Sequence, residues 1–221
     1  MNIPDPRRTL LFDLDGTLID SVADLTASAN HTRAHYGLGA VSEEVIAGFV
    51  GDGARKLLVR TLREAGGEVS VDEALQVFRG HYLDHCLDRT EPFVGIPELL
   101  LRLAPRALAI VSNKPQPMCD RIADGLGWRE HFRVVVGARP GVAVKPDPAL
   151  LALACEEMGV TRSSEVWMVG DSPNDVRSGR ALGATTVAVG YGLTAPETLR
   201  RAEPDHYVDS VADLAALLLE A

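Results

Sequence analysis

The chain has 221 residues, of which 46% are hydrophobic and 24% charged, and its formal net charge at pH 7 is -9. This length and composition fit a globular protein with one large domain or two small ones. The acidic balance argues against a nucleic acid or an anionic membrane as partner, because both require a basic patch that displaces counterions. An anionic small molecule is compatible only with locally concentrated positive charge.

The cysteine usage and the N-terminal segment bear on the cellular compartment. The three cysteines, Cys86, Cys119 and Cys155, stand singly without a CxxC pair, which argues against a disulfide framework and a cysteine zinc site. The apolar run that begins at Leu10 ends at Asp13, too early for a signal peptide or a membrane span. We therefore expect a cytoplasmic protein, as a monomer or homodimer, without a membrane partner.

The first predicted strand, in TLLFDLD from Thr9, is followed by a long helical region. Apolar residues recur there with helical spacing in four segments, which are 22–35, 43–50, 54–64 and 71–87. A structureless connection of this length would be unusual in a compact domain. We interpret the four helices as an inserted domain, here called the cap, with residues 16–20 and the EPFVGIP segment as its hinges. The predicted cap is 18–91 and the predicted core domain is 1–17 together with 92–221.

The second half of the chain alternates strands with helices. Four more strands are predicted in ALAIVSN, FRVVVGA, EVWMVGD and TTVAVG, which begin at Ala107, Phe132, Glu165 and Thr185. Helical patterns separate them at 117–126, 148–158 and 175–182, and ADLAALLLEA closes the chain as an amphipathic helix. Such alternation predicts an α/β fold, a Rossmann-like doubly wound parallel sheet covered on both faces.

Polar side chains follow four of the five predicted strands. They are Asp13 and Asp15, Ser112 and Asn113, Lys145, and Asp171 and Asp175. Singly, each has a structural explanation, since an acid pair can cap a turn, SPND can cap a helix and a loop lysine is commonly solvated. Ligands of doubly wound sheets bind beyond the carboxyl ends of the strands. The joint, ordered occurrence of these residues therefore favours one functional site.

The acids of this site need a counter-charge. Two like charges about 4 Å apart repel by about 4 kcal/mol at an effective dielectric of 20. A hard divalent cation resolves the repulsion, and an all-oxygen ligand set suits Mg²⁺ better than zinc. Magnesium beside Lys145 in turn indicates a phosphate group, because phosphoryl transfer requires mainly positioning and charge neutralisation. Strand alternation would turn Leu14 away and leave Asp13 and Asp15 facing the same site.

Taken together, these segments resemble the four motifs of the haloacid dehalogenase superfamily. DLDGT, VSN, KPDP and GDSPND occur in that order over nearly the whole chain. The resemblance implies Asp13 as nucleophile, Asp15 as general acid and then base, and Ser112 and Lys145 as ligands of the phosphoryl group. It also implies an Mg²⁺ ion held by Asp13, Asp171, the backbone carbonyl at Asp15, and Asp175 directly or through water. Thr17 would stabilise the turn and orient the pair of acids, and both Thr17 and Asn113 are candidate substrate-binding residues.

The second acid distinguishes activities within the superfamily. The dehalogenases resembled here lack the carboxylate at the position of Asp15, because a halide leaving group needs no proton. An alkoxide leaving group does need one. The chain is therefore interpreted as a phosphatase that acts through an aspartyl phosphate.

The cap loop VGDGARKLLVRTL is the candidate for substrate selection. Gly53 lies at a predicted helix start, a natural anion site, and Arg55 adds charge; a plain turn with a solvated basic face is the structural alternative. The loop, the NKP after Ser112 and the GYG at 190–192 are similar to bacterial phosphoglycolate phosphatases, which implies a small phosphate ester such as 2-phosphoglycolate. The three lysines, Lys56, Lys114 and Lys145, all lie near the proposed cleft.

Several alternatives share these motifs. A sugar-phosphate phosphatase, a pyrophosphatase or a β-phosphoglucomutase-like enzyme has the same core. A phosphonate hydrolase would need a Schiff-base lysine, for which Lys56 is the cap candidate. A non-catalytic binding protein is disfavoured because no motif residue is missing. The histidines at i, i+4 spacing, His31 with His35 and His81 with His85, are interpreted as cap surface or core.

Overall fold

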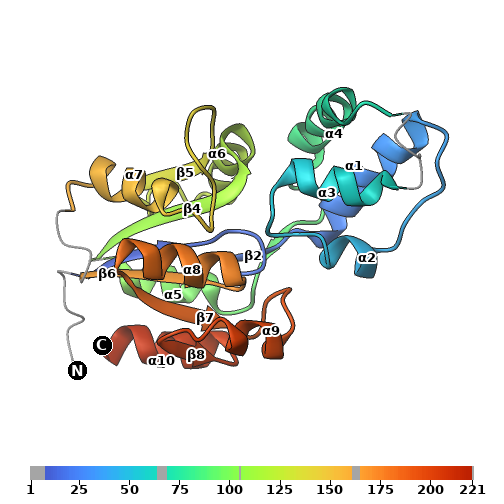
Figure 1. Cartoon of the computed structure of the whole chain (residues 1–221). Coiled ribbons are helices and arrows are strands. Elements are labelled where there is room, and N and C mark those ends of the chain that lie inside the picture. Colours follow the sequence, from blue (N-terminus) through green and yellow to red (C-terminus); the bar gives the residue numbers. More distant parts are fainter. Residues whose placement is uncertain (1–7, 64–68, 105, 161–164, 221) are drawn as a thin grey trace.

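The computed structural model describes residues 8–63, 69–104, 106–160 and 165–220. Within them, one parallel sheet of six strands has the order β5-β4-β1-β6-β7-β8 (Figure 1). The strands are β1 (Thr9–Phe12), β4 (Ala107–Pro115), β5 (Val134–Ala138), β6 (Val166–Gly170), β7 (Thr185–Val189) and β8 (His206–Val208). The chain winds from β1 to β4 and β5 and returns to β6 on the other side of β1. The order in which the parallel strands are added therefore reverses beside β1.

Helices cover both faces of the sheet, as the alternation predicts. The core helices are α5 (Ile96–Leu103), α6 (Gln116–Gly125), α7 (Ala149–Glu157), α8 (Pro173–Leu182), α9 (Pro196–Arg201) and α10 (Val211–Glu220). Leu10 and Phe12 of β1 pack in one apolar cluster with α5, α6 and α10, whereas Leu11 packs in a second cluster with α7. The alternating side chains of β1 are thus buried on both sides, which is typical of parallel sheets.

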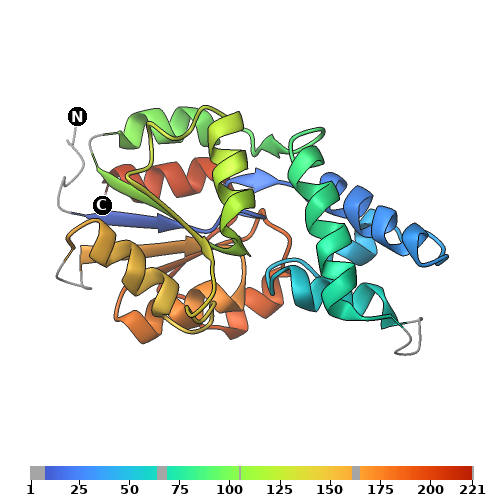
Figure 2. The same ribbon diagram turned by 90° about the horizontal axis from the view of Figure 1, so that it is seen from above.

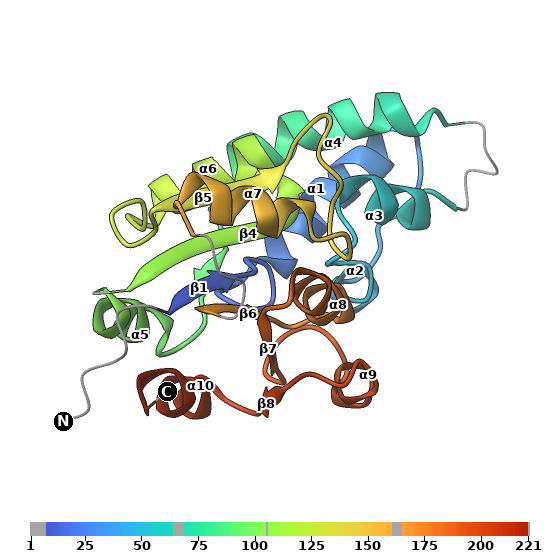
Figure 3. The ribbon, with the colours of Figure 1, turned by 60° about the vertical axis from the view of Figure 1, so that its left-hand side comes forward.

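The cap consists of four helices beside one end of the sheet, which confirms the predicted architecture (Figures 1 and 2). They are α1 (Val22–His35), α2 (Glu43–Ala47), α3 (Ala54–Thr61) and α4 (Val71–His85). Leu57, Leu58 and Phe78 are buried in the cluster that also contains Phe12 of the sheet. The cap helix α4 contacts α6 of the core (Figure 3). Cap and core therefore share an apolar contact.

The two connections to the cap are paired with each other. The short strands β2 (Ile19–Asp20) and β3 (Glu91–Pro92) form an antiparallel ribbon. Beside it, the buried carboxylate of Asp24 accepts hydrogen bonds from the backbone amides of Arg89 at 3.0 Å and Thr90 at 2.8 Å. The start of α1 and the return segment are therefore fastened together.

The structure differs from the predicted elements in several places. The prediction lacked α5, α9, β8 and the β2–β3 ribbon. The helix predicted for 43–50 ends at Ala47, and that predicted for 54–64 ends at Thr61, with residue 64 outside the described residues. The strand β1 ends at Phe12, so strand alternation does not set the directions of Asp13 and Asp15. In the described part of the chain, no helix has the length and apolar character needed to cross a membrane.

Candidate active site

The ends of three neighbouring strands bring the predicted site together. Asp13 follows β1, Ser112 lies near the end of β4, and Asp171 follows β6, and β1 is hydrogen-bonded to both other strands. After Asp15 the chain turns at Gly16, whose φ is 83°. A Cβ atom at Gly16 would lie 2.2 Å from the Asp171 carboxylate, so only glycine allows this turn to approach the acid.

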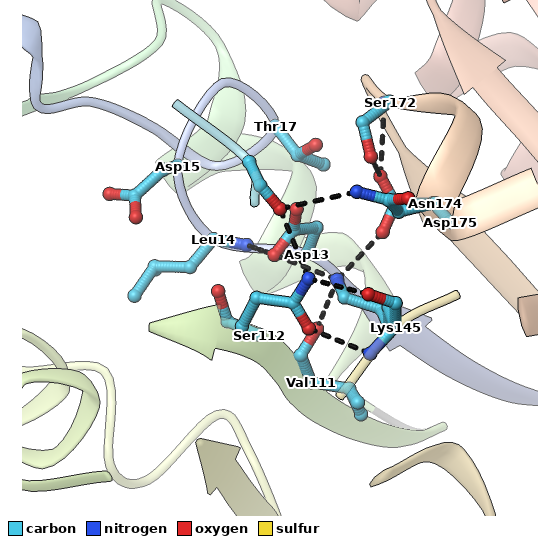
Figure 4. Close-up of polar contacts among 12 residues, drawn as sticks. Asp13, Leu14, Asp15, Thr17, Val111, Ser112, Lys145, Ser172, Asn174 and Asp175 are labelled. Atoms are coloured by element: carbon cyan, nitrogen blue, oxygen red, sulfur yellow. Dashed lines mark hydrogen bonds and ion pairs between the residues drawn. The ribbon is translucent and has the colours of Figure 1, made fainter. Parts of the chain in front are cut away.

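Lys145 is the electrostatic centre of the site (Figure 4). Its buried ammonium lies 3.0 Å from Asp13 Oδ1, and it donates hydrogen bonds to Asp175 Oδ1 at 2.6 Å and to the carbonyl of Val111 at 2.7 Å. These three acceptors match the three N–H donors of an ammonium. Burial disfavours the charged lysine, but Asp13 and Asp175 more than compensate and hold its pKa above the ordinary value. Lys145 is thus a permanent cation.

Asp13, Asp171 and Asp175 form a buried carboxylate cluster. Each offers an oxygen atom, and these oxygens lie within 4.8 Å of one another. Burial and the charge of Asp175, opposed by Lys145, raise the pKa of Asp13 to about 6. Burial and the charges of Asp13 and Asp175 hold the pKa of Asp171 well above its ordinary range. The single charge of Lys145 therefore does not neutralise the three carboxylates. The carboxylate oxygens of the cluster are ligands that fit a hard divalent cation.

The hydrogen bonds of the three acids leave one oxygen exposed to the site. Asp175 Oδ2 accepts from the amide and hydroxyl of Ser172, and Asp171 Oδ2 accepts from the amide of Leu193 at 2.8 Å. Asp13 Oδ1 accepts from the amide of Leu14 at 2.7 Å. No donor among residues 8–63, 69–104, 106–160 and 165–220 contacts Asp13 Oδ2. That oxygen is free to react or to bind a metal.

The Asp15 carboxylate points away from Lys145 and the cluster (Figure 4). It accepts two hydrogen bonds from the buried ammonium of Lys114, at 2.7 and 2.9 Å, and one from the hydroxyl of Ser21 at 2.5 Å. The side-chain carboxylate of Asp15 is therefore not among the candidate metal ligands. The expected metal ligand at this position is the backbone carbonyl of Asp15, not its side chain. Asp15 and Asp13 nevertheless line the same pocket.

Ser112 and Asn113 differ in what their side chains do. The Ser112 hydroxyl lines the pocket beside Asp13 and accepts from the amide of Lys114 at 3.3 Å. The Asn113 amide group donates to the carbonyls of Lys145 and Gly51 and accepts from the amide of Lys145 at 2.8 Å. Asn113 thus connects β4, the Lys145 loop and the cap, and its polar atoms are occupied.

Thr17 and the GYG segment at 190–192 pack against Asp171. The buried Thr17 hydroxyl lies 3.4 Å from Asp171 Oδ1, and Thr17 does not line the pocket. The Tyr191 hydroxyl donates to the carbonyl of Thr17 at 3.0 Å. A Cβ at Gly192 would lie 2.3 Å from the Cβ of Asp171, so this loop packs directly against the acid. These residues fix the orientation of Asp171.

The pocket lies between cap and core. Besides the residues already named, its walls are Leu25, Phe49, Val50, Gly51, Gly53, Ala54, Leu57, Phe78, Tyr82, Lys114, Pro115 and Met118. Gly53 begins α3 with a φ of 87°, and a Cβ there would lie 3.3 Å from the carbonyl oxygen of Asn113. The cap loop therefore closes directly over the core.

The two charged residues of the cap loop lie outside this pocket. Arg55 is exposed and forms an ion pair with Asp72 of α4. Lys56 is also exposed, 3.6 Å from Asp52. Neither reaches the wall that Asp13 and Asp15 share, so the structure does not bring Arg55 together with the rest of the predicted site.

Three further residues take part to which the sequence assigned no role in the site, although Lys114 was expected near the cleft. Lys114 binds Asp15, Tyr82 of α4 lines the pocket, and Asn174 donates to Asp52 Oδ1 at 3.1 Å across the cap–core boundary. The NKP and SPND segments contain Lys114 and Asn174, so their position beside motif residues was the available signal. Tyr82 had none, because its place depends on how α4 docks.

Comparisons with known proteins agree with this geometry. The family model for haloacid dehalogenase-like hydrolases matches residues 10–189. A phosphoglycolate phosphatase of Chromobacterium violaceum is 36% identical over 218 residues, which cover 96% of each chain. An N-acetylmuramic acid 6-phosphate phosphatase of Pseudomonas aeruginosa is 36% identical over 192 residues, covering 86% of this chain and 84% of that one.

A solved structure extends the similarity to three dimensions. The crystal structure of a predicted phosphoglycolate phosphatase from Haemophilus somnus 129pt superimposes with a TM-score of 0.86 and 26% identity, covering 95% of this chain and 97% of the other. The similarity includes the cap as well as the sheet domain, since nearly the whole of both chains is covered. The chain belongs to the haloacid dehalogenase-like hydrolases and is a phosphatase of small phosphate esters.

Proposed function

We propose that the protein hydrolyses 2-phosphoglycolate to glycolate and phosphate, through a phosphorylated Asp13. The observation that carries the mechanism is the buried group of Asp13, Lys145 and Asp171, which places a free carboxylate oxygen beside a fixed cation and a set of metal-binding oxygens. The relatives named phosphoglycolate phosphatase support the substrate. We further propose that the domains divide at 17/18, just before β2, and at 91/92, within β3.

The reaction has two steps. The Asp13 carboxylate attacks phosphorus, the bond from phosphorus to the ester oxygen breaks, and Asp15 gives its proton to the leaving alkoxide. A water molecule then attacks the phosphorus of the aspartyl phosphate, and Asp15 takes the proton. Phosphate leaves and the Asp13 carboxylate is restored. Ser112 and Lys145 bind the non-bridging oxygens throughout.

Asp13, Asp171 and Asp175 would hold Mg²⁺, the last directly or through water. The ion supplies charge neutralisation for the phosphoryl oxygens and for the acids that otherwise repel each other. Because this proposal depends on oxygen ligands, zinc should substitute poorly. The three free, buried cysteines are compatible with the reducing cytoplasm, where we place the reaction.

A kinetic panel tests the proposal. Phosphate release is measured with Mg²⁺, and with EDTA, from 2-phosphoglycolate, N-acetylmuramic acid 6-phosphate, sugar phosphates and p-nitrophenyl phosphate. We expect the highest kcat/KM for 2-phosphoglycolate, loss of activity with EDTA, and no turnover by Asp13→Asn. Another ester hydrolysed ten times better would reject the substrate, and comparable turnover by Asp13→Asn would reject the nucleophile.

A further inference from the structure

The Tyr82 hydroxyl is a buried polar group without a partner. Tyr82 lies on the cap helix α4, is 0% exposed and lines the pocket that holds Asp13 and Asp15. Within the described residues, its hydroxyl forms no hydrogen bond. An unpaired buried hydroxyl destabilises the folded protein, and such groups in native proteins usually have a function or a missing partner. The free hydroxyl therefore points to a ligand group that is absent from the unliganded protein.

Lys114 lies against the same tyrosine. Its Nζ is 4.6 Å from the centroid of the Tyr82 ring, and two of its three N–H donors are used by Asp15. Burial raises the pKa of the Tyr82 hydroxyl, whereas Lys114 lowers it through its charge and as the nearest hydrogen-bond donor, and Asp15 raises it. Lys114 therefore lies close to the hydroxyl, although the two groups do not form a hydrogen bond of good geometry. The hydroxyl is therefore a proton donor at neutral pH, at the charged end of the pocket.

An ammonium in this protein can bridge two carboxylates. Lys145 does so in the same site, with Asp13 at 3.0 Å and Asp175 at 2.6 Å. By the same geometry, Lys114 can keep its hydrogen bonds to Asp15 and donate its remaining N–H to a second anion. The rest of the wall offers little competition for that anion. Ser112 is assigned to the phosphoryl group, the side chain of Asn113 is already hydrogen-bonded, and Leu25, Phe49 and Phe78 are apolar.

We propose that the Tyr82 hydroxyl, with the third N–H of Lys114, binds a carboxylate on the leaving alcohol, which makes Tyr82 a specificity-determining residue. This inference rests on the proposed phosphatase reaction. Since Asp15 protonates the ester oxygen, that oxygen must lie beside Asp15. A carboxylate on the adjacent carbon then falls next to Lys114 and Tyr82.

The size of the pocket limits the substrate further. Its cavity volume is about 30 Å³, and a buried water needs about 10–15 Å³ of such space. This space, which Asp13 and Ser112 also line, is small, so it favours a short acid such as glycolate over an acid carried on a sugar ring.

Tyr82→Phe tests this inference, because it removes only the hydroxyl. The measured quantity is the ratio of kcat/KM for 2-phosphoglycolate to that for 2-hydroxyethyl phosphate, its uncharged analogue of similar size. We expect the ratio to fall by about 10- to 100-fold in Tyr82→Phe, the value of a hydrogen bond to a charged group. Tyr36→Phe, a cap tyrosine outside the pocket, is the matched control and should keep the ratio.

Stability separates a binding role from a structural one. Since the hydroxyl has no partner in the free protein, Tyr82→Phe should have an unchanged or higher Tm. An unchanged ratio in Tyr82→Phe, or a fall in kcat/KM equal for both esters, would overturn the inference while leaving the phosphatase proposal intact. A wild-type enzyme that does not prefer 2-phosphoglycolate over its uncharged analogue would instead reject the proposed substrate.

Discussion

The ammonium of Lys145 lies 3.0 Å from Oδ1 of Asp13, and both side chains are almost fully buried. Lys145 supplies the positive charge that offsets the repulsion among the three converging carboxylates of Asp13, Asp171 and Asp175. Lys145→Met should therefore lower the Tm of the metal-free protein by about 10 °C, because losing one partner of a buried ion pair costs about 3–5 kcal/mol. Thermal unfolding with and without Mg²⁺ measures this.

The same variant should be stabilised by Mg²⁺ more than the wild type is, since the ion replaces the lost charge. Lys56→Met removes an exposed lysine and serves as the control. If Lys145→Met and Lys56→Met melt together without metal, the lysine does not hold the acids.

Asp15→Asn should separate the two chemical steps. The variant cannot protonate a poor leaving group or activate water, so turnover of 2-phosphoglycolate should fall by about 10²–10⁴-fold. With p-nitrophenyl phosphate, whose leaving group needs no proton, the first step should continue and the aspartyl phosphate should accumulate. Mass spectrometry after acid quenching detects the added phosphoryl group. Its absence from Asp15→Asn, under conditions that release p-nitrophenol, would contradict the two-step mechanism.

Asn174 should contribute to closing the cap. Its side chain donates to Asp52 Oδ1 at 3.1 Å and to the carbonyl of Gly51 at 3.4 Å. Asn174→Ala should lower kcat/KM by about 2- to 10-fold, the value of an ordinary hydrogen bond. Asn174→Asp should be worse, because it sets two carboxylates against each other across the boundary. Steady-state kinetics compares the two, and an aspartate variant as active as the alanine variant would show that this contact does not matter.

Arg55→Ala should have little effect on the hydrolysis of 2-phosphoglycolate. The guanidinium is exposed and pairs with Asp72, and it does not line the pocket. We expect the KM for 2-phosphoglycolate to change by less than about twofold, within the small range of exposed ion pairs. Asp72→Ala, which frees Arg55 from its partner, is the companion measurement. A large, carboxylate-dependent rise in KM for Arg55→Ala would mean that Arg55 leaves Asp72 to bind substrate.

The histidine stack of the cap predicts a pH dependence of stability. The ring of His81 stacks between His31 at 4.2 Å and His85 at 4.3 Å, with Asp84 and Asp88 nearby. Burial, and then His31 and His85, lower the pKa of His81 below its ordinary 6.5. The folded protein thus holds fewer protons than the unfolded chain, so stability present above about pH 6.5 is lost as the pH falls below it.

His81→Gln should therefore reduce the loss of Tm between pH 7 and pH 5, compared with the wild type. His131→Gln, in the core, is the control. An equal loss in His81→Gln and the wild type would show that this stack does not control acid stability.

The sheet and the positions of its acids and of Lys145 were predictable from one rule about parallel sheets. Parallel strands end at one edge, so Asp13, Ser112 and Asp171 must lie together whatever the cap does. The helix α5 has an apolar pattern at Ile96, Leu99, Leu100 and Leu103, but the prolines of the adjoining hinge segment indicate a loop there and obscure the helical signal. The strand β8 has three residues, too few for a periodic signal.

What could not be predicted depends on docking of one domain against another. The contact of Lys114 with Tyr82 joins residues of β4 and α4 that no local pattern relates. The pairing of Arg55 with Asp72 likewise decides that a loop cation faces solvent and not the substrate. A positively charged residue in a loop near the predicted cleft is therefore only a candidate for binding the substrate. The packing of the cap decides which of these cations faces the pocket.

The β2–β3 ribbon determines how the cap can move. Ile19 pairs with Pro92 and Asp20 with Glu91, and two strands joined in this way cannot bend independently. The outgoing and the return connection of the cap therefore move as one unit. The contact of Gly51 with Asn113 and that of Tyr82 with Lys114 both join this unit to the core domain. Any displacement of the cap at the ribbon changes both contacts together, so access to the pocket and the arrangement of its wall are coupled.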